Sequence, residues 1–215
     1  YAVSLMAGHE HNRRAWDRLA RNDHRFAKPA STAELSNPLA TVDGYGWLGE
    51  SIRGQRVLCL AAGGGRQGPL YAAAGGEVTV VDISSAQLEI DRQVAGEHGL
   101  SLRTVATSMD DLSMFADAIF DLVIQPVSTC YLPDVWPVFQ EVARVTRPDG
   151  IYISQHKTPT SLQTSFDSVE QGTGYVMEQP YYREGPLPSA PANRFREEGT
   201  LEYLHRWEQL LGGIT

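Results

Sequence analysis

The sequence is poor in cysteine, in basic charge and in long hydrophobic runs, and each shortage excludes a class of protein. Cys59 and Cys130 are its two cysteines and lack CxxC spacing, which excludes a disulfide scaffold and favours a reducing, cytoplasmic setting. It contains no run of 18 apolar residues and no signal-peptide pattern, so no membrane span or secretion is expected. Lys and Arg total 18 against 26 Asp and Glu, a net charge of −8, which argues against nucleic acids and anionic membranes as partners.

What remains is an ordinary globular composition. Hydrophobic residues make up 42% and charged residues 20% of the 215 residues, unlike a disordered chain. This length predicts one domain with additional segments, large enough to bury a core without disulfides or metals. The first residues, which do not begin with methionine, are left out of the prediction of the fold.

The pattern along the chain predicts three parts within this one domain. Residues 1–45 read as an N-terminal helical cap and loop, with a helix over 10–27. Residues 46–156 read as a core of alternating strands and helices. Residues 157–215 read as an irregular segment that covers a substrate, followed by a helix over 201–211.

The core pattern predicts a parallel sheet covered on both faces. We expect strands over 56–61, 77–83, 102–107, 120–126 and 151–156, and helices over 67–74, 84–98 and 134–146. Near-continuous apolar runs such as VLCLA and DLVI are typical of strands buried on both faces. The helix over 84–98 begins with Ser84 and Gln87 in the pattern of a capping box and ends at Gly99. The fold class is therefore α/β with right-handed crossovers.

The most informative feature is a glycine-rich loop followed by an acidic residue. Gly63, Gly65 and Gly68 spell GxGxxG between the first strand and the next helix, where glycine lets a backbone turn sharply and approach a ligand. Asp82 follows at the end of the second strand, where its carboxylate can accept hydrogen bonds from ribose hydroxyls. The combination predicts a nucleoside-containing cofactor.

This loop alone does not separate a dinucleotide from S-adenosylmethionine. Arg66 would suit a pyrophosphate, which keeps an NAD(P)-dependent oxidoreductase open. Against it, the sequence lacks the Tyr-x-x-x-Lys pair of one large nicotinamide class and a second domain to carry substrate. A non-catalytic protein that binds a nucleoside cofactor on the same fold is the third alternative.

The order of the motifs resembles the class I S-adenosylmethionine-dependent methyltransferases. VLCLAAGGG stands where that family has VLDLGCGTG, SMDD at 108–111 where it has its adenine loop, and FDLV at 120–123 in its fourth strand. TRPDG at 146–150 resembles the family's turn before the fifth strand. The resemblance implies a Rossmann-like, doubly wound, mostly parallel sheet flanked by helices. It also implies S-adenosyl-L-methionine as cofactor and S-adenosyl-L-homocysteine as product.

Three positions depart from the family pattern. Cys59 replaces the acid of the first strand, and Ala61 replaces the first glycine, which is tolerable if its φ stays below zero. Ser108 replaces the aspartate of the adenine loop, so Asp110 or Asp111 is expected to take over the contact with the adenine amine.

The resemblance also implies a set of site residues. The expected cofactor-binding residues are Ala61, Ala62, Gly63, Gly64, Gly65, Asp82, Ile83, Ser108, Met109, Asp110, Gln125 and Pro126. Met109 suits either the adenine face or the core, and Gln125 would contact the methionine portion. Substrate contacts are expected from Trp16, Ser128, Tyr131 and Tyr181, with Trp16 serving either as a lid or as a packing anchor.

No convincing catalytic or metal-binding constellation accompanies these residues. His156 ends the fifth strand and is a candidate general base, with a structural role as its alternative. Histidine spacing predicts no metal. Tyr182 and Phe195, in the irregular segment, are substrate-contact candidates without an assigned role. Methyl transfer from a sulfonium mainly needs alignment of the reactants, so this lack is compatible with an enzyme.

These observations together predict a small-molecule methyltransferase, monomeric or homodimeric, that acts by in-line displacement. The family's sheet continues into a C-terminal hairpin of two further strands, and the sequence stops after residues 201–211 without them. An uncovered fifth strand would be a bare edge. We therefore expect either that the natural chain continues or that residues 157–200 or another chain covers this edge.

Overall fold

The structure is a computed structural model that describes residues 2–22, 28–165, 174–189 and 196–212. Five strands form one sheet: β1 (Arg56–Leu60), β2 (Glu77–Asp82), β3 (Leu102–Ala106), β4 (Phe120–Gln125) and β5 (Thr146–Ser154). The described helices are α1 (Ala2–Arg21), α2 (Thr32–Ser36), α3 (Pro38–Val42), α4 (Gln67–Ala73), α5 (Ser85–Glu97), the 3₁₀ turn η2 (Thr129–Tyr131), α6 (Trp136–Val145), α7 (Pro159–Gln163) and α9 (Trp207–Leu210).

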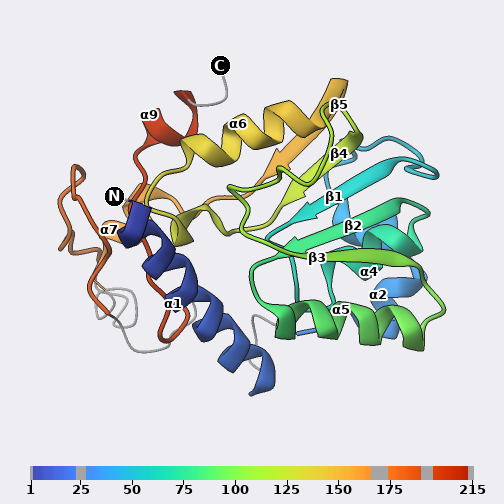
Figure 1. The fold of residues 1–215 in the computed structure, drawn as a ribbon, viewed down its shortest axis with the longest axis horizontal. Helices are drawn as coiled ribbons and strands as arrows, with labels where there is room; N and C mark the ends of the chain where they lie inside the picture. The colour runs from blue at the N-terminus through green and yellow to red at the C-terminus, as the bar shows by residue number, and fades with distance from the viewer. Residues whose placement is uncertain (1, 23–27, 166–173, 190–195, 213–215) are drawn as a thin grey trace.

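The sheet is entirely parallel in the order β3-β2-β1-β4-β5 (Figure 1). The chain moves outward from β1 to β3 and then crosses to β4 on the other side of β1. The strand order therefore reverses between β1 and β4, and the carboxyl ends of these two strands flank the place where such sheets bind ligands.

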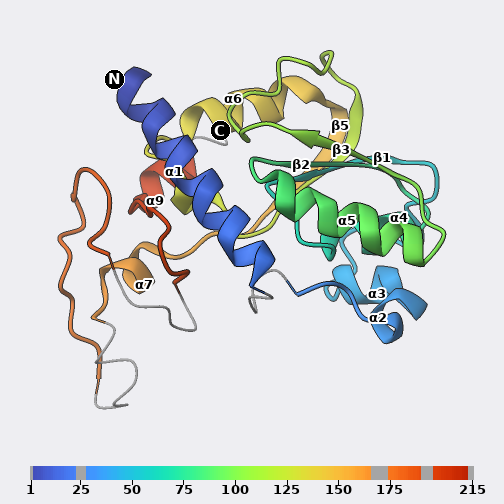
Figure 2. The same cartoon turned by 60° about the horizontal axis from the view of Figure 1, so that its bottom comes forward.

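Alternate residues of the strands supply two cores. Leu58, Leu60 and Val123 face α6, whose Val138 and Val142 pack on them. Val57, Cys59 and Val80 face the opposite side, with Tyr71 of α4 and Leu88 of α5. Figure 2 shows α6 on one side of the sheet and α2 to α5 on the other. The doubly wound α/β fold is confirmed, and apolar strands without alternation follow from this burial on both faces.

Helix α1 and the segment before α9 close the carboxyl end of the sheet. In both cartoons α1, in dark blue, runs past this end, with the orange and red C-terminal segments on its far side (Figures 1 and 2). Asp17 of α1 accepts a 2.6 Å hydrogen bond from Ser84, the N-cap residue of α5. Farther along, Asn12 exchanges hydrogen bonds with the backbone of Leu201 (2.7 and 3.0 Å). Helix α1 and the segment before α9, which are distant in sequence, thus together cover this end of the sheet. They are here called the roof.

Several predicted boundaries differ from those of the structure. The N-terminal helix begins at Ala2 and ends at Arg21, with Ala15 and Leu19 buried as expected, whereas Phe26 lies outside the described residues. The predicted loop over 28–45 contains α2, capped by Ser31 and Glu34, and α3, which begins at Pro38. β5 begins at Thr146, so it includes the turn-like TRPDG segment, where Asp149 has a φ of 62°.

The predicted helix over 201–211 is wrong for its first half. Residues 201–206 are irregular apart from an isolated bridge at Tyr203, and α9 covers Trp207–Leu210 alone. Tyr203 donates its N–H to the carbonyl of Cys130 (2.7 Å), and Leu187 donates to Glu202 (2.7 Å). Non-local backbone hydrogen bonds therefore replace the intrahelical ones.

β5 is the edge strand of the described sheet. Its inner side pairs with β4, and no strand of the described residues, including those within 157–200, pairs with its outer side. The described part of 157–200 therefore does not extend the sheet at this edge.

Candidate active site

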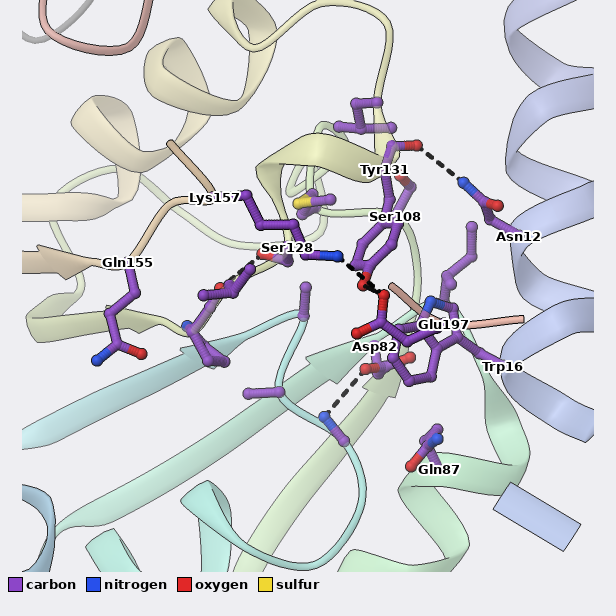
Figure 3. Close-up of a pocket in the computed structure, with 18 of the residues that line it drawn as sticks. Asn12, Trp16, Asp82, Gln87, Ser108, Ser128, Tyr131, Gln155, Lys157 and Glu197 are labelled. Atoms are coloured by element: carbon purple, nitrogen blue, oxygen red, sulfur yellow. Dashed lines mark hydrogen bonds and ion pairs between the residues drawn. The ribbon is translucent and has the colours of Figure 1, made fainter. Parts of the chain in front are cut away.

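A cavity of about 470 Å³ lies at the carboxyl ends of β1, β2 and β4, under the roof. Figure 3 shows Asp82 and Gln87 on one side of this space, with Tyr131, Lys157 and Glu197 above these two, and Trp16 and Asn12 coming from α1. The floor comes from the glycine loop and the walls from segments far apart in sequence. Its size is within the range of small-molecule sites.

Gly63 is required by the close packing at the floor. A Cβ atom at this position would lie 2.6 Å from Cβ of Gln87 and 3.0 Å from the carboxyl carbon of Asp82. Its N–H donates a 2.9 Å hydrogen bond to Oδ2 of Asp82. The loop and the carboxylate at the end of β2 therefore hold each other in place.

Two buried carboxylates support the glycine loop from below. Asp82 also accepts the N–H of Ser84 (2.8 Å), and Asp91 of α5 accepts the N–H of Gly64 (2.9 Å). Burial raises the pKa of Asp82 to about 6 and that of Asp91 to about 7, although these backbone hydrogen bonds oppose the rise. Asp82 lines the cavity, so its remaining lone pairs are available to a ligand.

Ala61 adopts a backbone conformation that favours glycine. Its φ is 49°, so the condition under which alanine would be tolerated without strain, a negative φ, is not met. The chain must turn sharply where it leaves β1, and the left-handed conformation costs an alanine about 1–2 kcal/mol.

Replacing Ala61 by glycine should therefore stabilise the protein by about 0.5–1 kcal/mol, because the relief of strain exceeds the added backbone entropy of the unfolded chain. Urea unfolding measures this change. Ala72→Gly, inside α4, is the matched control and should destabilise by about 1 kcal/mol. Equal losses in both variants would show that Ala61 is unstrained.

Gln87 is the most unusual group in the cavity wall. Its side chain is 2% exposed, yet neither its Nε2 nor its Oε1 atom has a hydrogen-bond partner among the residues that the structure describes. Ser84 caps α5 as predicted by accepting the N–H of Gln87 (3.2 Å). The reciprocal bond of a capping box, from the N–H of Ser84 to the side chain of Gln87, is absent. A buried, unpaired amide costs about 1–3 kcal/mol, which a polar ligand can recover.

The loop after β3 supplies a second wall. Ser108 and Met109 line the cavity, and Met109, 7% exposed, also belongs to the core. Asp110 does not line it, because its carboxylate turns to His9 of α1, with Nε2 and Oδ2 3.3 Å apart. Asp110 thus ties the roof to this loop.

Gln125, at the end of β4, lies behind the wall and is fully buried. Its amide donates to Ser128 (3.0 Å) and contacts the sulfur of Met109 (3.2 Å), and its carbonyl oxygen accepts the hydroxyl of Tyr152. Ser128 lines the cavity but also donates to the carbonyl of Pro126 (2.9 Å), so its hydroxyl is already engaged.

The wall beyond β4 and β5 carries an aromatic pair and a charged cluster. Trp16 meets Tyr131 edge-on with ring centroids 5.4 Å apart. The hydroxyl of Tyr131 donates to Oε2 of Glu197 (2.6 Å), and Nζ of Lys157 donates to the same atom (3.0 Å). Lys157 also pairs with Glu202, a fully buried carboxylate.

Comparison with known proteins identifies the family of this chain. A family model described as "Methyltransferase domain" matches residues 58–154. The "Uncharacterized methyltransferase YbaJ" of Bacillus subtilis (strain 168) is 36% identical over 216 residues, covering 94% of this chain and 84% of the relative. The chain belongs to the class I S-adenosylmethionine-dependent methyltransferases.

Two further similarities are narrower. The "Ubiquinone biosynthesis O-methyltransferase" of Haemophilus ducreyi is 33% identical over 102 residues, which is 46% of this chain and 43% of that protein. The crystal structure of an S-adenosylmethionine-dependent methyltransferase from Mesorhizobium loti superposes with a TM-score of 0.64 at 18% identity, over 84% of this chain and 80% of that one. The structural similarity confirms the Rossmann-like methyltransferase fold.

Within this methyltransferase, many of the expected residues meet at the cavity. Those that line it are Trp16, Ala61, Ala62, Gly63, Asp82, Ile83, Ser108, Met109, Pro126, Ser128 and Tyr131. Gly64, Gly65, Asp110 and Gln125, which were also expected to bind the cofactor, do not line it. Arg66 lines it but pairs with Glu34 (2.6 Å).

The expected catalytic residue His156 and the expected substrate contact Tyr181 do not line the cavity either. His156 is held between Thr129 at Nδ1 and Ser154 at Nε2, both 2.9 Å away, and burial together with His205 lowers its pKa. The hydroxyl of Tyr181 accepts the N–H of Trp207 and donates to Glu208, both at 2.9 Å. Both residues thus have structural partners instead. Tyr182 is 72% exposed, and Phe195 lies outside the described residues.

Among the wall residues that the sequence reasoning missed are Gln87, Lys157 and Glu197. The sequence could have indicated Gln87, since the first turn of the helix after β2 faces the glycine loop. It could not have indicated Lys157 and Glu197, because their contact depends on how the irregular segment folds.

No group of three or more His, Cys, Asp or Glu side chains among the described residues could hold a metal ion. No helix within the same residues is long and apolar enough to cross a membrane.

Proposed function

We propose that this methyltransferase binds S-adenosylmethionine in the cavity at the carboxyl ends of β1, β2 and β4 and methylates a small molecule there. The observation that carries the proposal is the orphaned amide of Gln87 beside the carboxylate of Asp82. A donor and acceptor group next to a carboxylate suits the two vicinal hydroxyls of a ribose.

The residues present fit the cofactor at three points. Asp82 and Gln87 would hold the ribose, and Ser108 and Met109 would hold the adenine. The backbone from Ala61 to Gly63 would hold the amino-acid end, because Gly63 leaves no Cβ in the way. When bound, the cofactor supplies an electrophilic methyl group on a sulfonium.

The protein's own contribution is positioning and exclusion of water. α1 and the C-terminal segment roof the cavity through Asn12 and Leu201, which keeps the reactants aligned in a dry space. The acidic net charge and the cavity of about 470 Å³ support a small-molecule acceptor over a nucleic acid. The two free, buried cysteines are compatible with the cytoplasmic setting, which remains part of the proposal.

The proposal is tested by ligand binding. S-adenosylhomocysteine should bind in calorimetry and raise the melting temperature by several degrees, whereas NAD and NADP should do neither. Stabilisation by the nicotinamides alone would overturn the proposal. Binding without methylation of any acceptor in a broad screen would instead support the non-catalytic alternative.

Gln87→Met offers a second test with opposite effects on two quantities. Removing the unpaired amide should stabilise the free protein by about 1–2 kcal/mol. Loss of the ribose contact should weaken S-adenosylhomocysteine binding roughly tenfold, about 1.4 kcal/mol. Gln93→Met, at an exposed position of α5, is the control and should change neither strongly. A Gln87→Met variant with undiminished affinity would remove this residue from the site.

A further inference from the structure

The segment of residues 196–205, here called the strap, brings a charged cluster into the cavity wall. His11 lies 2.8 Å from the carbonyl of Gly199, and Asn12 holds Leu201. On the other side, His205 contacts the carbonyls of Thr129 and Leu132 (3.1 and 2.8 Å). The strap is therefore fixed at several points between α1 and η2.

The charges of the cluster balance within the wall. Glu202 binds Lys157 through Oε1 and Arg196 through Oε2, and its side chain is fully buried. Glu197, with a side chain 5% exposed, binds Lys157 from the other side. Two cations face two carboxylates, so the cluster offers no uncompensated positive charge for an anionic acceptor.

Glu197 nevertheless keeps one oxygen available. Its Oε2 receives both donors, the hydroxyl of Tyr131 and the ammonium of Lys157. No donor among the described residues reaches Oε1, and Glu197 lines the cavity. In Figure 3 the side chain of Glu197 extends from the strap into the space between Tyr131 and Asp82.

This oxygen lies on the side of the cavity where the methyl acceptor is expected, away from the ribose end. The ribose end is marked by Asp82, beyond β2, whereas Tyr131 and Lys157 follow β4 and β5. Two other polar residues on that side are engaged: Asn12 binds Tyr131 and Leu201, and the hydroxyl of Ser128 both donates and accepts. Val127, Leu132 and Leu162 supply apolar surface around it.

We propose that Glu197 is the general base of the reaction and that the acceptor is a neutral small molecule reacting through a hydroxyl or an amine. This inference rests on the proposed function. The acceptor's oxygen or nitrogen forms a bond to the methyl carbon with its own electron pair. The carbon–sulfur bond breaks and its electron pair stays on sulfur, while the proton of the O–H or N–H group passes to Oε1 of Glu197 and then to water.

This assignment limits the acceptor class. A carboxylic acid, ionised at neutral pH, would meet the carboxylate of Glu197 with both nearby cations already paired, and like charges in such a site repel. Phenols and amines with an apolar body suit the wall formed by Trp16, Val127 and Leu162. They also need a base, because they are weak nucleophiles or must lose a proton on methylation.

The experiment uses the full chain with S-adenosylmethionine and three acceptor panels: phenols, primary amines and carboxylic acids. Turnover is read as S-adenosylhomocysteine formed, and activity is expected with phenols or amines. In Glu197→Gln the rate with the best acceptor should fall at least 100-fold, the range of general-base catalysis. Glu198→Gln, at the exposed neighbouring position of the strap, should stay within twofold of the wild type.

A matched pair of phenols separates proton transfer from a structural role. Glu197→Gln should slow an un-ionised phenol strongly. The slow reaction of 2,4-dinitrophenol, an anion at neutral pH that Glu197 repels, should stay unchanged or become faster, because the anion has no proton to transfer and the variant removes the repelling charge. Calorimetry with S-adenosylhomocysteine and the melting temperature report whether the variant is folded. If it is not, Glu197→Asp, which keeps the charge beside Lys157, takes its place.

The outcomes separate this inference from the proposed function. Failure of the wild type to bind S-adenosylhomocysteine would overturn the proposed function. With binding intact, the inference is overturned by turnover of carboxylic acids alone, by no turnover in the phenol and amine panels, or by equal penalties for the two phenols.

Discussion

Asp82→Ala is expected to weaken S-adenosylhomocysteine binding by at least about 100-fold while the protein still folds. The variant loses charge-assisted hydrogen bonds to ribose hydroxyls, worth roughly 1.5–3 kcal/mol each. It also frees the N–H of Gly63 and Ser84, which Asp82 now accepts at 2.9 and 2.8 Å. Folding should survive because burial already disfavours the ionised carboxylate, as the rise of its pKa to about 6 indicates.

Calorimetry measures this loss, and Glu77→Ala, exposed at the other end of β2, is the control. The hydroxyls prefer the ionised carboxylate, so wild-type affinity should fall as the pH drops from 7.5 through the pKa of about 6 to 5. Asp82→Asn should lose this dependence, since an amide does not titrate there. Undiminished affinity in Asp82→Ala would show that the ribose lies elsewhere.

Glu202→Gln should destabilise the protein by about 3 kcal/mol, or lower its melting temperature by roughly 10 °C. The carboxylate is fully buried and binds Lys157 and Arg196 with its two oxygens. An amide has one acceptor, and its NH₂ group would face a cation that also donates. Removing one charge thus leaves another buried without its counter-ion.

Thermal unfolding with and without S-adenosylhomocysteine checks this result. Glu208→Gln breaks a pair with Arg206 whose glutamate side chain is 53% exposed, and it should cost less than about 0.5 kcal/mol. Faster proteolysis of the strap in Glu202→Gln would show that the loss is local. If the two variants had the same stability and the same resistance, the buried cluster would not hold the strap.

Local patterns in the sequence were sufficient to predict the sheet and its helices. The apolar runs of β1 and β4 reflect burial on both faces, and Ser84 and Gly99 mark the ends of α5. The C-terminal helix was overpredicted, because Leu201, Leu204 and Trp207 recur at helical spacing. That pattern could not reveal that this backbone would pair with Cys130 and Leu187.

The candidate site likewise has one part that the sequence predicted and one part that it did not. Its floor, from Ala61 to Gly63 with Asp82, could be predicted because two adjacent strands and their short loops place it. The cavity wall beyond β4 and β5 could not be predicted, because Glu197 belongs to a segment without periodicity. Lys157 is positioned by that same segment. Ala61 shows a third case, in which the residue type indicated the opposite backbone conformation from the one that the turn imposes.

The joining of Asn12 to Leu201 has a consequence for the order of assembly. The two residues are 189 positions apart, whereas all five strands lie between Arg56 and Ser154. During synthesis the strands can pair as soon as they emerge, but the roof cannot close until the strap has been made. Closing so long a loop comes late in folding, so the chain passes through a stage with its sheet formed and its ligand cavity still open to water.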